Sequence, residues 1–403
     1  MLPKPPKSKS NHVDRLSPQI HGLELRLLQD HSMRSSLALN PRSSIPCLPF
    51  LTYPFSTTFP KQPNPDRSNK KKKSPRPRAE LVQSESTRIP TLERLVERDS
   101  FFKFLTKSIE FLSKQPQHAL RLDDATKLHN ELGFLRGRNV AHSIKRHPLI
   151  FETYRRRRDG EMWFRLTDFM EKLLEEERDL ANSMVLHRVN TLRKLLMMSS
   201  EKRIPMRKIH HCRYLFGIPD DFRDRIAKYP DFFRIVDNGD GGEILELVNW
   251  DQTLAVSALE KELMVVDEEK VKKAMDLNLD EGEKRKLKLL DSLPLVSPYS
   301  DGSIFDACSL EAEKYRLGML HEFLSLTIEK KAYMHHIVEL RNELSLSKNV
   351  YQMVLKQPRK FYVAGTVKNW VVFLKDAYDE NGRLIKKDPQ VVFNEKLYSY
   401  AQM

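Results

Sequence analysis

The chain has 403 residues, which is enough for one large domain or for two or three small ones. Its composition, 40% hydrophobic and 31% charged, is typical of a helix-rich soluble protein. No stretch approaches the roughly 20 apolar residues of a membrane helix, so we expect a soluble or peripheral protein without membrane insertion. The formal net charge of +14 points toward nucleic acid, but only the local placement of that charge can support this interpretation.

Most of the positive charge lies at the N-terminus. Residues 1–79 hold 15 Lys/Arg against 4 Asp/Glu, which leaves 54 basic and 51 acidic residues in 80–403. The segment is also rich in Ser and Pro, so it cannot bury a core, and its composition is typical of an organellar transit peptide. A start at Met33 instead of Met1 would give a compact presequence. The run of lysines at 70–73 could be a nuclear signal, but behind a presequence we favour a disordered basic linker.

Helical periodicity begins at about Thr91. Phe101, Leu105, Ile109 and Leu112 fall on one face of a predicted helix. A second, short helix is predicted from Leu122, because the two aspartates that follow suit the first turn of a helix.

An internal repeat follows, with three copies centred on Pro148, Pro230 and Pro358. Relative to each proline, apolar residues stand at −14 (Phe134, Phe216, Leu344), −8 (Val140, Phe222, Val350) and −4 (Ile144, Ile226, Val354), a cation at −2 (Arg146, Lys228, Lys356) and phenylalanine at +3 (Phe151, Phe233, Phe361). The −8 and −4 positions make one helical stripe, and the residue before a proline avoids the helical region. Each copy therefore predicts a helix that ends at the proline, with a cation against its dipole. Coincidence among proline-ended helices is the alternative, which five matching positions disfavour.

Strand-like runs follow each proline, at 162–166, at 232–236 with 244–248, and at 370–374, the last returning at 383–385. We therefore predict a mainly α fold with small β-hairpins: tandem helix–turn–helix plus wing (winged-helix-like) modules at about 100–167, 200–250 and 330–376. Long helices at 168–199 and 253–290 and a proline-marked linker at 292–299 join them. The expected domains are 1–79 (transit peptide and linker), 80–376 (nucleic-acid-binding domain) and 377–403 (C-terminal hairpin or tail).

Basic residues gather at the repeats. Residues 136–165 hold 9 Lys/Arg and 3 acids, 187–213 hold 8 and 1, and 348–368 hold 5 and none. A phosphate backbone needs such a track, and counterion release makes its binding sensitive to salt. We expect the modules to pack side by side and to align these blocks. The candidate RNA-binding residues are Arg136, Arg138, Lys145, Arg146, Arg155, Arg156, Arg157, Arg158, Arg203, Arg207, Lys208, Arg213, Lys356, Arg359 and Lys360.

The most suggestive run is one tyrosine followed by four arginines, at 154–158. Arginine can pair bidentately with phosphate and stack on bases. The alternative is a solvated turn with its aromatic residues in the core. Residues 359–362 also interleave cations with aromatics, but there we expect Phe361 in the core.

No motif indicates catalysis. The chain lacks GxGxxG, a Walker A loop, HExxH and GxSxG, so we do not expect an enzyme. The three cysteines, Cys47, Cys212 and Cys308, form no CxxC pair. His210 and His211 beside Cys212 lack a second Cys/His pair at suitable spacing, so we predict neither a metal nor a cofactor.

Several short motifs occur in a fixed order. They are Lys/Arg-x-Pro-x-x-Phe at 146–151 and 228–233, Leu-Gly-Phe at 132–134, Phe-Gly-Ile-Pro at 216–219, and Leu-Pro followed by Ser-Pro-Tyr within 293–299. With these motifs, the segment from about Thr91 to Asp376 resembles the Plant Organelle RNA Recognition (PORR) domain, although 91–107 is a less typical beginning.

The resemblance implies a nuclear-encoded plant protein that binds intron-containing organellar transcripts and promotes splicing of group II introns, together with other splicing factors. The RNA would perform the chemistry while the protein stabilises its fold. Arginine after Met33 favours the mitochondrion, with the chloroplast as the alternative. Two other hypotheses are a DNA-binding organellar factor, since winged-helix modules can enter the major groove, and a purely structural protein.

Overall fold

The computed structural model describes residues 88–134, 139–239, 241–263, 281–366 and 369–403. The predicted transit peptide, the Met33 start and the lysine run at 70–73 lie outside the described residues. Within the described ranges, no helix is both long and apolar enough to cross a bilayer.

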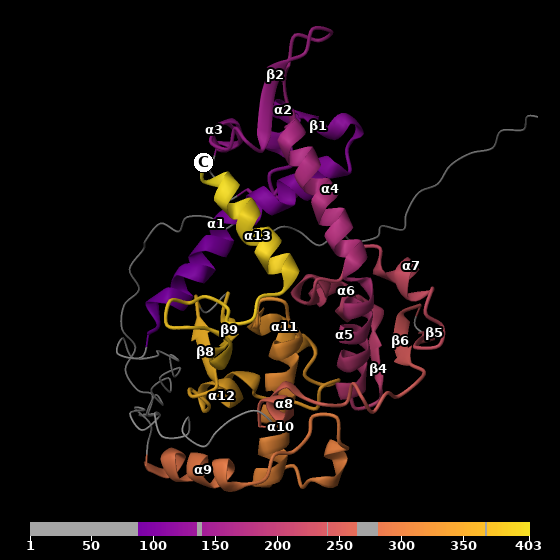
Figure 1. The fold of residues 1–403 in the computed structure, drawn as a ribbon, viewed down its shortest axis with the longest axis vertical. Helices are drawn as coiled ribbons and strands as arrows, with labels where there is room; N and C mark the ends of the chain where they lie inside the picture. The colour runs from indigo at the N-terminus through magenta and orange to yellow at the C-terminus, as the bar shows by residue number, and fades with distance from the viewer. Residues whose placement is uncertain (1–87, 135–138, 240, 264–280, 367–368) are drawn as a thin grey trace, which may run out of the picture. The chain divides into compact units, whose positions relative to one another are not determined.

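Three modules share one order of elements, and each begins with a helix (Figure 1). The first module comprises α1 (Pro90–Ser113), β1 (Ala119–Arg121), α2 (Leu122–Lys127), α3 (Val140–Lys145), β2 (Phe151–Arg155) and β3 (Met162–Leu166). The second comprises α5 (Val185–Met198), β4 (Arg203–Pro205), α6 (Met206–Cys212), α7 (Phe222–Ile226), β5 (Phe233–Asp237) and β6 (Glu243–Leu247). The third comprises α10 (Leu310–Leu326), β7 (Lys331–Tyr333), α11 (Met334–Glu339), α12 (Val350–Leu355), β8 (Phe361–Ala364) and β9 (Val371–Leu374).

Each module contains a three-stranded antiparallel sheet in which the last strand lies between the other two. The remaining helices are α4 (Asp168–Ser183), α8 (Ala258–Leu263), α9 (Glu281–Ser292) and α13 (Pro389–Ala401). The expectation of a helix-rich chain with small β-elements is therefore confirmed.

The proline turn is built identically in all three modules. The carbonyl before the proline accepts a hydrogen bond from the amide of the phenylalanine three residues after it, at 3.0, 3.1 and 3.0 Å for Phe151, Phe233 and Phe361. These three rings are 3%, 5% and 2% exposed. The helices begin at the −8 position, and the side chains at −8 and −4 are all buried. The predicted stripe and the predicted phenylalanine anchor are thus confirmed.

The −14 position does not align in the structure as it does in the sequence. A residue with positive φ ends the preceding turn in each module, and it is Gly133, Gly217 or Ser345. Gly133 lies two residues farther from its proline than the other two do. The structural counterpart of Phe134 is therefore Ile218, whose amide likewise bonds to a carbonyl five residues earlier.

Two predicted segments differ in the structure. Strand β9 pairs with β8 and β7, and not with residues 383–385. Tyr378 and Leu384 form only an isolated bridge. The long helix expected at 168–199 is divided at Met184, where ψ is 0°. Of the helix expected at 253–290, only α8 and α9 are helical in the described part, and 264–280 lies outside it.

The second and third modules pack against each other reciprocally. Corresponding residues lie 128 positions apart, as Pro230 and Pro358 do. The amide of Ser200 donates to the carbonyl of Glu343 at 2.8 Å, and the amide of Ile328 donates to the carbonyl of Leu215 at 2.8 Å. Exchanging the two modules converts one bond into the other, which is the signature of a local two-fold relation. Both modules contribute to one continuous hydrophobic core.

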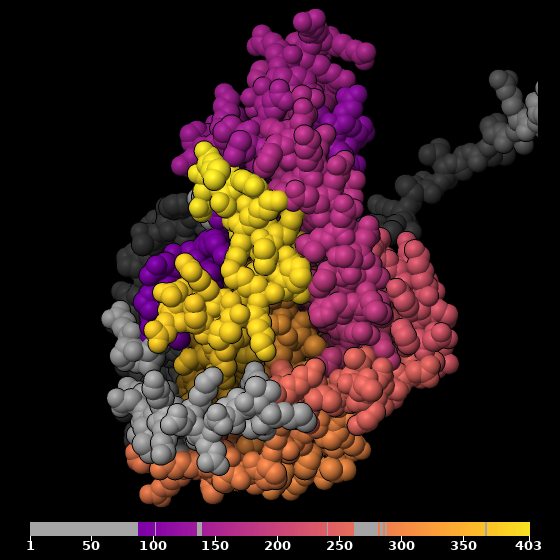
Figure 2. All heavy atoms as spheres, viewed as in Figure 1, coloured from indigo at the N-terminus to yellow at the C-terminus, as the bar shows by residue number. Residues whose placement is uncertain are grey.

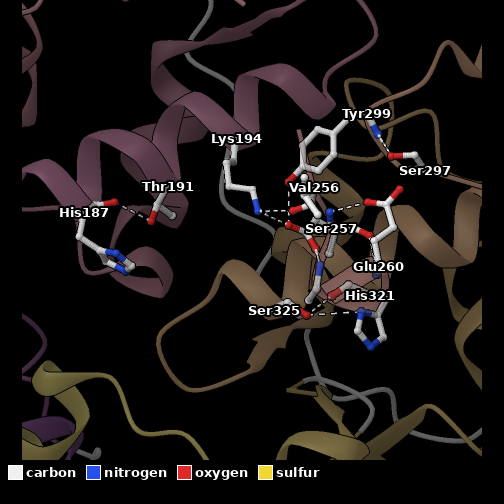
Figure 3. Close-up of polar contacts among 12 residues, drawn as sticks. His187, Thr191, Lys194, Val256, Ser257, Glu260, Ser297, Tyr299, His321 and Ser325 are labelled. Carbon is white, nitrogen blue, oxygen red and sulfur yellow. Dashed lines mark hydrogen bonds and ion pairs between the residues drawn. The ribbon is translucent and has the colours of Figure 1, made fainter. Parts of the chain in front are cut away.

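Residues near this two-fold axis contact their own counterparts. Lys194 of α5 and Glu322 of α10 are such a pair, and their side chains form an ion pair at 2.8 Å. Glu322 is 1% exposed, and it also accepts bonds from the hydroxyl of Tyr299 and from the amide of Ala258 at 2.6 Å each. Figure 3 shows Lys194 and Tyr299 converging from separate elements on this point. The proline-marked linker is therefore fastened to the shared core through Tyr299.

The first module has a core of its own, which the C-terminal helix completes. Phe393, Leu397 and Ala401 of α13 are buried there, and Tyr398 stacks on Phe102 of α1 with ring centroids 4.5 Å apart. Figure 2 shows this C-terminal segment (yellow) lying against the magenta surface of the neighbouring helices.

Two ion pairs connect the first module and α13 to the shared core. Asp388, the N-cap of α13, accepts two bonds from the buried guanidinium of Arg188 on α5, at 2.7 and 2.8 Å. Asp99 of α1 pairs with Lys331, which is 8% exposed. Buried pairs such as these are costly to break, because removal of one partner leaves an uncompensated charge.

Phe233→Ala should lower the free energy of unfolding by about 3–5 kcal/mol, because the cavity it leaves adds to the lost burial. Urea unfolding followed by circular dichroism measures the change. Ile304→Ala is the matched control, since Ile304 is 71% exposed and its change should stay within about 0.5 kcal/mol. An unchanged unfolding midpoint for the Phe233 variant would refute the assignment of this ring to the core.

His321 should make stability depend on pH. Burial lowers its pKa to about 4; Lys360 also lowers it, and Glu322 and Asp376 oppose this. Below an unfolded pKa of about 6.5, the unfolded chain binds a proton that the folded chain does not. The free energy of unfolding should therefore fall as pH drops from about 6.5 to 4, with His321 contributing up to about 1.4 kcal/mol per pH unit. His321→Gln should reduce the slope of urea stability against pH, and an equal slope in both proteins would contradict this.

Candidate nucleic-acid interface

The four consecutive arginines at 155–158 lie at the β2–β3 turn. Gly160, with φ of +68°, lets the turn close, and its amide bonds to the carbonyl of Arg156 at 2.9 Å. Arg155, Arg157 and Arg158 are exposed, and Arg156 is half-buried. Among the residues that the structure describes, no carboxylate forms an ion pair with any of the four. Their charge is therefore available to an external anion.

Two aromatic side chains lie beside these arginines. Tyr154 of β2 and Trp163 of β3 are directly paired across the strands, on the face opposite the buried Phe164. The guanidinium of Arg156 lies 4.5 Å from the ring centroid of Trp163, and that of Arg165 lies 5.8 Å from Tyr154. Both rings are half-exposed, so these aromatics lie outside the core. Such an arrangement of rings and guanidinium groups suits stacking on bases.

The indole of Trp163 is held in place by a hydrogen bond. Its Nε1 donates to the carboxylate of Asp159 at 3.1 Å. Backbone hydrogen bonds lower the pKa of that carboxyl, and the indole adds to this effect, so Asp159 stays ionised. The ring is thus preorganised on the hairpin surface.

Other predicted cations also remain exposed. Lys145 and Arg146 lie at the end of α3, Lys356 follows α12 in the equivalent place, and Arg207 lies on α6. In the described part of the chain none of these four side chains has a carboxylate within 4.0 Å. Arg136 and Arg138 lie outside the described residues.

The remaining predicted cations are engaged within the protein. Their carboxylate partners are Glu201 for Arg203, Glu343 for Lys208, Asp220 for Arg213, Asp291 for Arg359 and Asp376 for Lys360. Burial opposes ionisation of Asp220, but hydrogen bonds from Lys114 and Arg213 lower its pKa to about 2. These cations would have to exchange a carboxylate for a phosphate, which makes them weaker candidates.

The structure does not bring the first and third basic blocks together. In Figure 1 the β2 hairpin and α12 lie near opposite ends of the described fold. The first-module cations therefore form one candidate surface, and Lys356 belongs to another part of the molecule.

A cleft of about 1790 Å³ lies between the modules, lined by α1, α5, α11, α13 and the turn before α7. Arg94, Lys103 and Lys107 of α1 and Arg178 of α4 line it, and all four are exposed. None has a carboxylate within 4.0 Å in the described residues. Tyr214, which is 47% exposed, also lines the cleft. Exposed cations and an exposed ring that line the same cleft make it a second candidate surface.

Sequence reasoning missed these cleft residues because α1 carries four basic and four acidic residues, which cancel in a running charge. The structure separates them. Glu93 accepts a bond from the hydroxyl of Tyr362 at 2.8 Å, and Asp99 pairs with Lys331. To separate the basic from the acidic residues of α1 by sequence alone, its helical periodicity would have had to be combined with the repeat.

These features define a helix-rich protein of three repeated modules that carries an arginine-rich hairpin and a partly basic cleft. The family model described as the plant organelle RNA recognition domain matches residues 87–403, so the chain belongs to that family. The match confirms the resemblance stated from the motifs. It also extends through α13, in agreement with the packing of that helix into the first-module core.

Curated plant proteins are similar over most of the chain. Protein WHAT'S THIS FACTOR 1 homolog, chloroplastic, from Oryza sativa subsp. japonica is 35% identical over 324 residues, which cover 76% of this chain and 63% of the relative. Its Arabidopsis thaliana counterpart is 33% identical, over 76% of this chain and 61% of the relative. Protein WHAT'S THIS FACTOR 9, mitochondrial, from Arabidopsis thaliana is 29% identical, over 59% of this chain and 64% of the relative.

The chain thus spans less than two thirds of the length of these relatives. The names of these relatives point to an organelle. They do not support the mitochondrion as the preferred compartment, which the arginine after Met33 had favoured. No solved structure matches the chain significantly.

Proposed function

We propose that this protein binds organellar RNA and promotes the splicing of group II introns by stabilising the folded intron, without itself catalysing a reaction. The observation that carries the proposal is the β2–β3 hairpin, where four arginines without carboxylate partners in the described structure lie beside the half-exposed rings of Tyr154 and Trp163. Membership of a family defined by organellar RNA recognition supports the same assignment. Other splicing factors would act with the protein on the same intron.

We further propose that each module is winged-helix-like. The order helix, strand, helix, helix, strand, strand, with the last strand central in the sheet, supports this. In such a module α3, α7 and α12 are the second helices of helix–turn–helix units, and the hairpins are the wings. The arginines then lie on the wing of the first module, while Lys145 and Arg146 lie at the end of its second helix.

Two features favour RNA over duplex DNA. Helices α3, α7 and α12 contain only five or six residues each, which offers little length to a major groove. The half-exposed Tyr154 and Trp163 suit unpaired bases, which RNA loops and bulges present. We propose that a strand bound at the hairpin continues into the cleft, where Lys103, Lys107 and Tyr214 are accessible.

The compartment is proposed to be an organelle, and the names of the relatives favour the chloroplast, with the mitochondrion as the alternative. The basic, serine-rich segment at 1–79 supports import into either one.

Replacing Arg155, Arg157 and Arg158 by alanine should weaken RNA binding and reduce its dependence on salt, with an unchanged fold. If each contacts one phosphate of single-stranded RNA, the slope of log K against log salt should fall by about 2. Fluorescence anisotropy at several salt concentrations measures this.

The control variant replaces Arg223, Arg225 and Arg234, which removes the same charge from residues paired with Glu243, Asp221 and Glu246. It should bind almost as well as the unchanged protein. Equal losses in the two variants would mean that net charge, and not the hairpin, controls binding.

RNA that co-immunoprecipitates from purified chloroplasts, and separately from purified mitochondria, should be enriched in one or a few intron-containing transcripts. Sequencing of that RNA identifies both the targets and the compartment. Recovery of organellar DNA, or of a protein partner with uniform background RNA, would instead support a DNA-binding or structural role and overturn the proposal.

A further inference from the structure

Three histidines meet where the second module packs on the third. His211 belongs to α6, and His335 and His336 belong to α11. Each offers a ring nitrogen, and these atoms all lie within 4.8 Å of one another. The centroid of the His211 ring lies 4.9 Å from that of His336 and 5.9 Å from that of His335. The sequence near His210 and His211 contains no second Cys/His pair, but His335 and His336 of the third module provide one in the structure.

The surroundings orient the His211 ring as metal ligands are usually oriented. Nδ1 of His211 lies 2.5 Å from a carboxylate oxygen of Glu339, so Nε2 is the atom that would ligate a metal. Carboxylate–histidine contacts of this kind fix the tautomer and raise ligand basicity in metal sites. His336 is 2% exposed and lies 3.3 Å from the hydroxyl of Tyr214.

The local two-fold relation provides a comparison inside the same molecule. The counterparts of His335, His336 and His211 are Arg207, Lys208 and Glu339. On that side of the axis the helices are joined by charge, because Lys208 pairs with Glu343 at 2.6 Å and donates to the carbonyl of Glu339 at 2.7 Å. On the other side of the axis, the three neighbouring imidazoles stand in place of that ion pair. A bound cation would there hold α6 and α11 together, as the ion pair does on the first side.

We propose that His211, His335 and His336 bind a zinc ion that joins α6 to α11 at the edge of the cleft. Three imidazoles with a fourth position open to solvent form a ligand set that zinc accepts, whereas magnesium and calcium prefer oxygen ligands. In a tetrahedral site the ligand nitrogens would be about 3.3 Å apart, so the rings must approach by up to about 1.5 Å. His211 and His335 are exposed and can rotate to do so. The proposal is independent of RNA binding.

The test uses the untagged full chain and cobalt(II) as a spectroscopic probe. Cobalt should give the visible absorption of a tetrahedral or five-coordinate site, and zinc should displace it. Glu339→Gln should weaken zinc binding by about 10–100-fold, as loss of a carboxylate that orients a ligand does. His211→Ala and His335→Ala should weaken it further. Zinc should also raise the melting temperature of the unchanged chain.

His210→Ala is the matched control, because His210 neighbours His211 and is exposed but lies outside the cluster. It should bind cobalt like the unchanged chain. His211→Ala and His335→Ala alter exposed side chains, so they test the proposal even if a His336 variant does not fold. Absence of a saturable cobalt spectrum, an unchanged spectrum in both exposed variants, or an equal loss in His210→Ala would each overturn the proposal.

Discussion

The reciprocal packing of the second module against the third is the interaction on which the rest of the structure depends. Neither sheet has more than three short strands, and small isolated sheets are only marginally stable. The two modules instead share one hydrophobic core, joined by the paired backbone bonds of Ser200 and Ile328. Everything else is positioned against this core. Asp99 connects α1 to it, Arg188 connects α13 to it, and Tyr299 fastens the linker.

The features that could be predicted from the sequence are those with local causes. The residue before a proline avoids the helical region, so the repeated proline marks the end of each helix, and the buried phenylalanine that follows needs only a short turn. The hairpin between β5 and β6 was predicted within one residue, because its glycines specify the turn. The alignment at the −14 position was wrong, because the two additional residues between Gly133 and Pro148 do not change the hydrophobic pattern.

The features that could not be predicted depend on contacts between distant segments. Lys208 lies in a basic stretch of the sequence but pairs with Glu343, 135 residues away, and Arg359 pairs with Asp291, 68 residues away. Conversely, the charges of α1 cancel in the sequence, whereas in the described structure Asp99 pairs with Lys331 and no carboxylate lies within 4.0 Å of Lys103 or Lys107. The histidine cluster required the pairing of α6 with α11. A count of charges along the chain therefore overestimates the positive charge available at some candidate sites and underestimates it at others. An unpaired cation releases its counterions when it meets phosphate, whereas a paired one must first give up its carboxylate.

The two-fold relation has a further consequence for the origin of the chain. In a dimer of identical subunits, a residue on the symmetry axis meets its own copy, so a lysine would face a lysine and a glutamate would face a glutamate. Here Lys194 faces Glu322. Such an opposite-charge pair requires two halves of different sequence, which a diverged repeat within one chain provides. Neither present half could pair with a copy of itself at this position without bringing two lysines or two glutamates together in the core. The two halves are in this sense obligate, unequal partners.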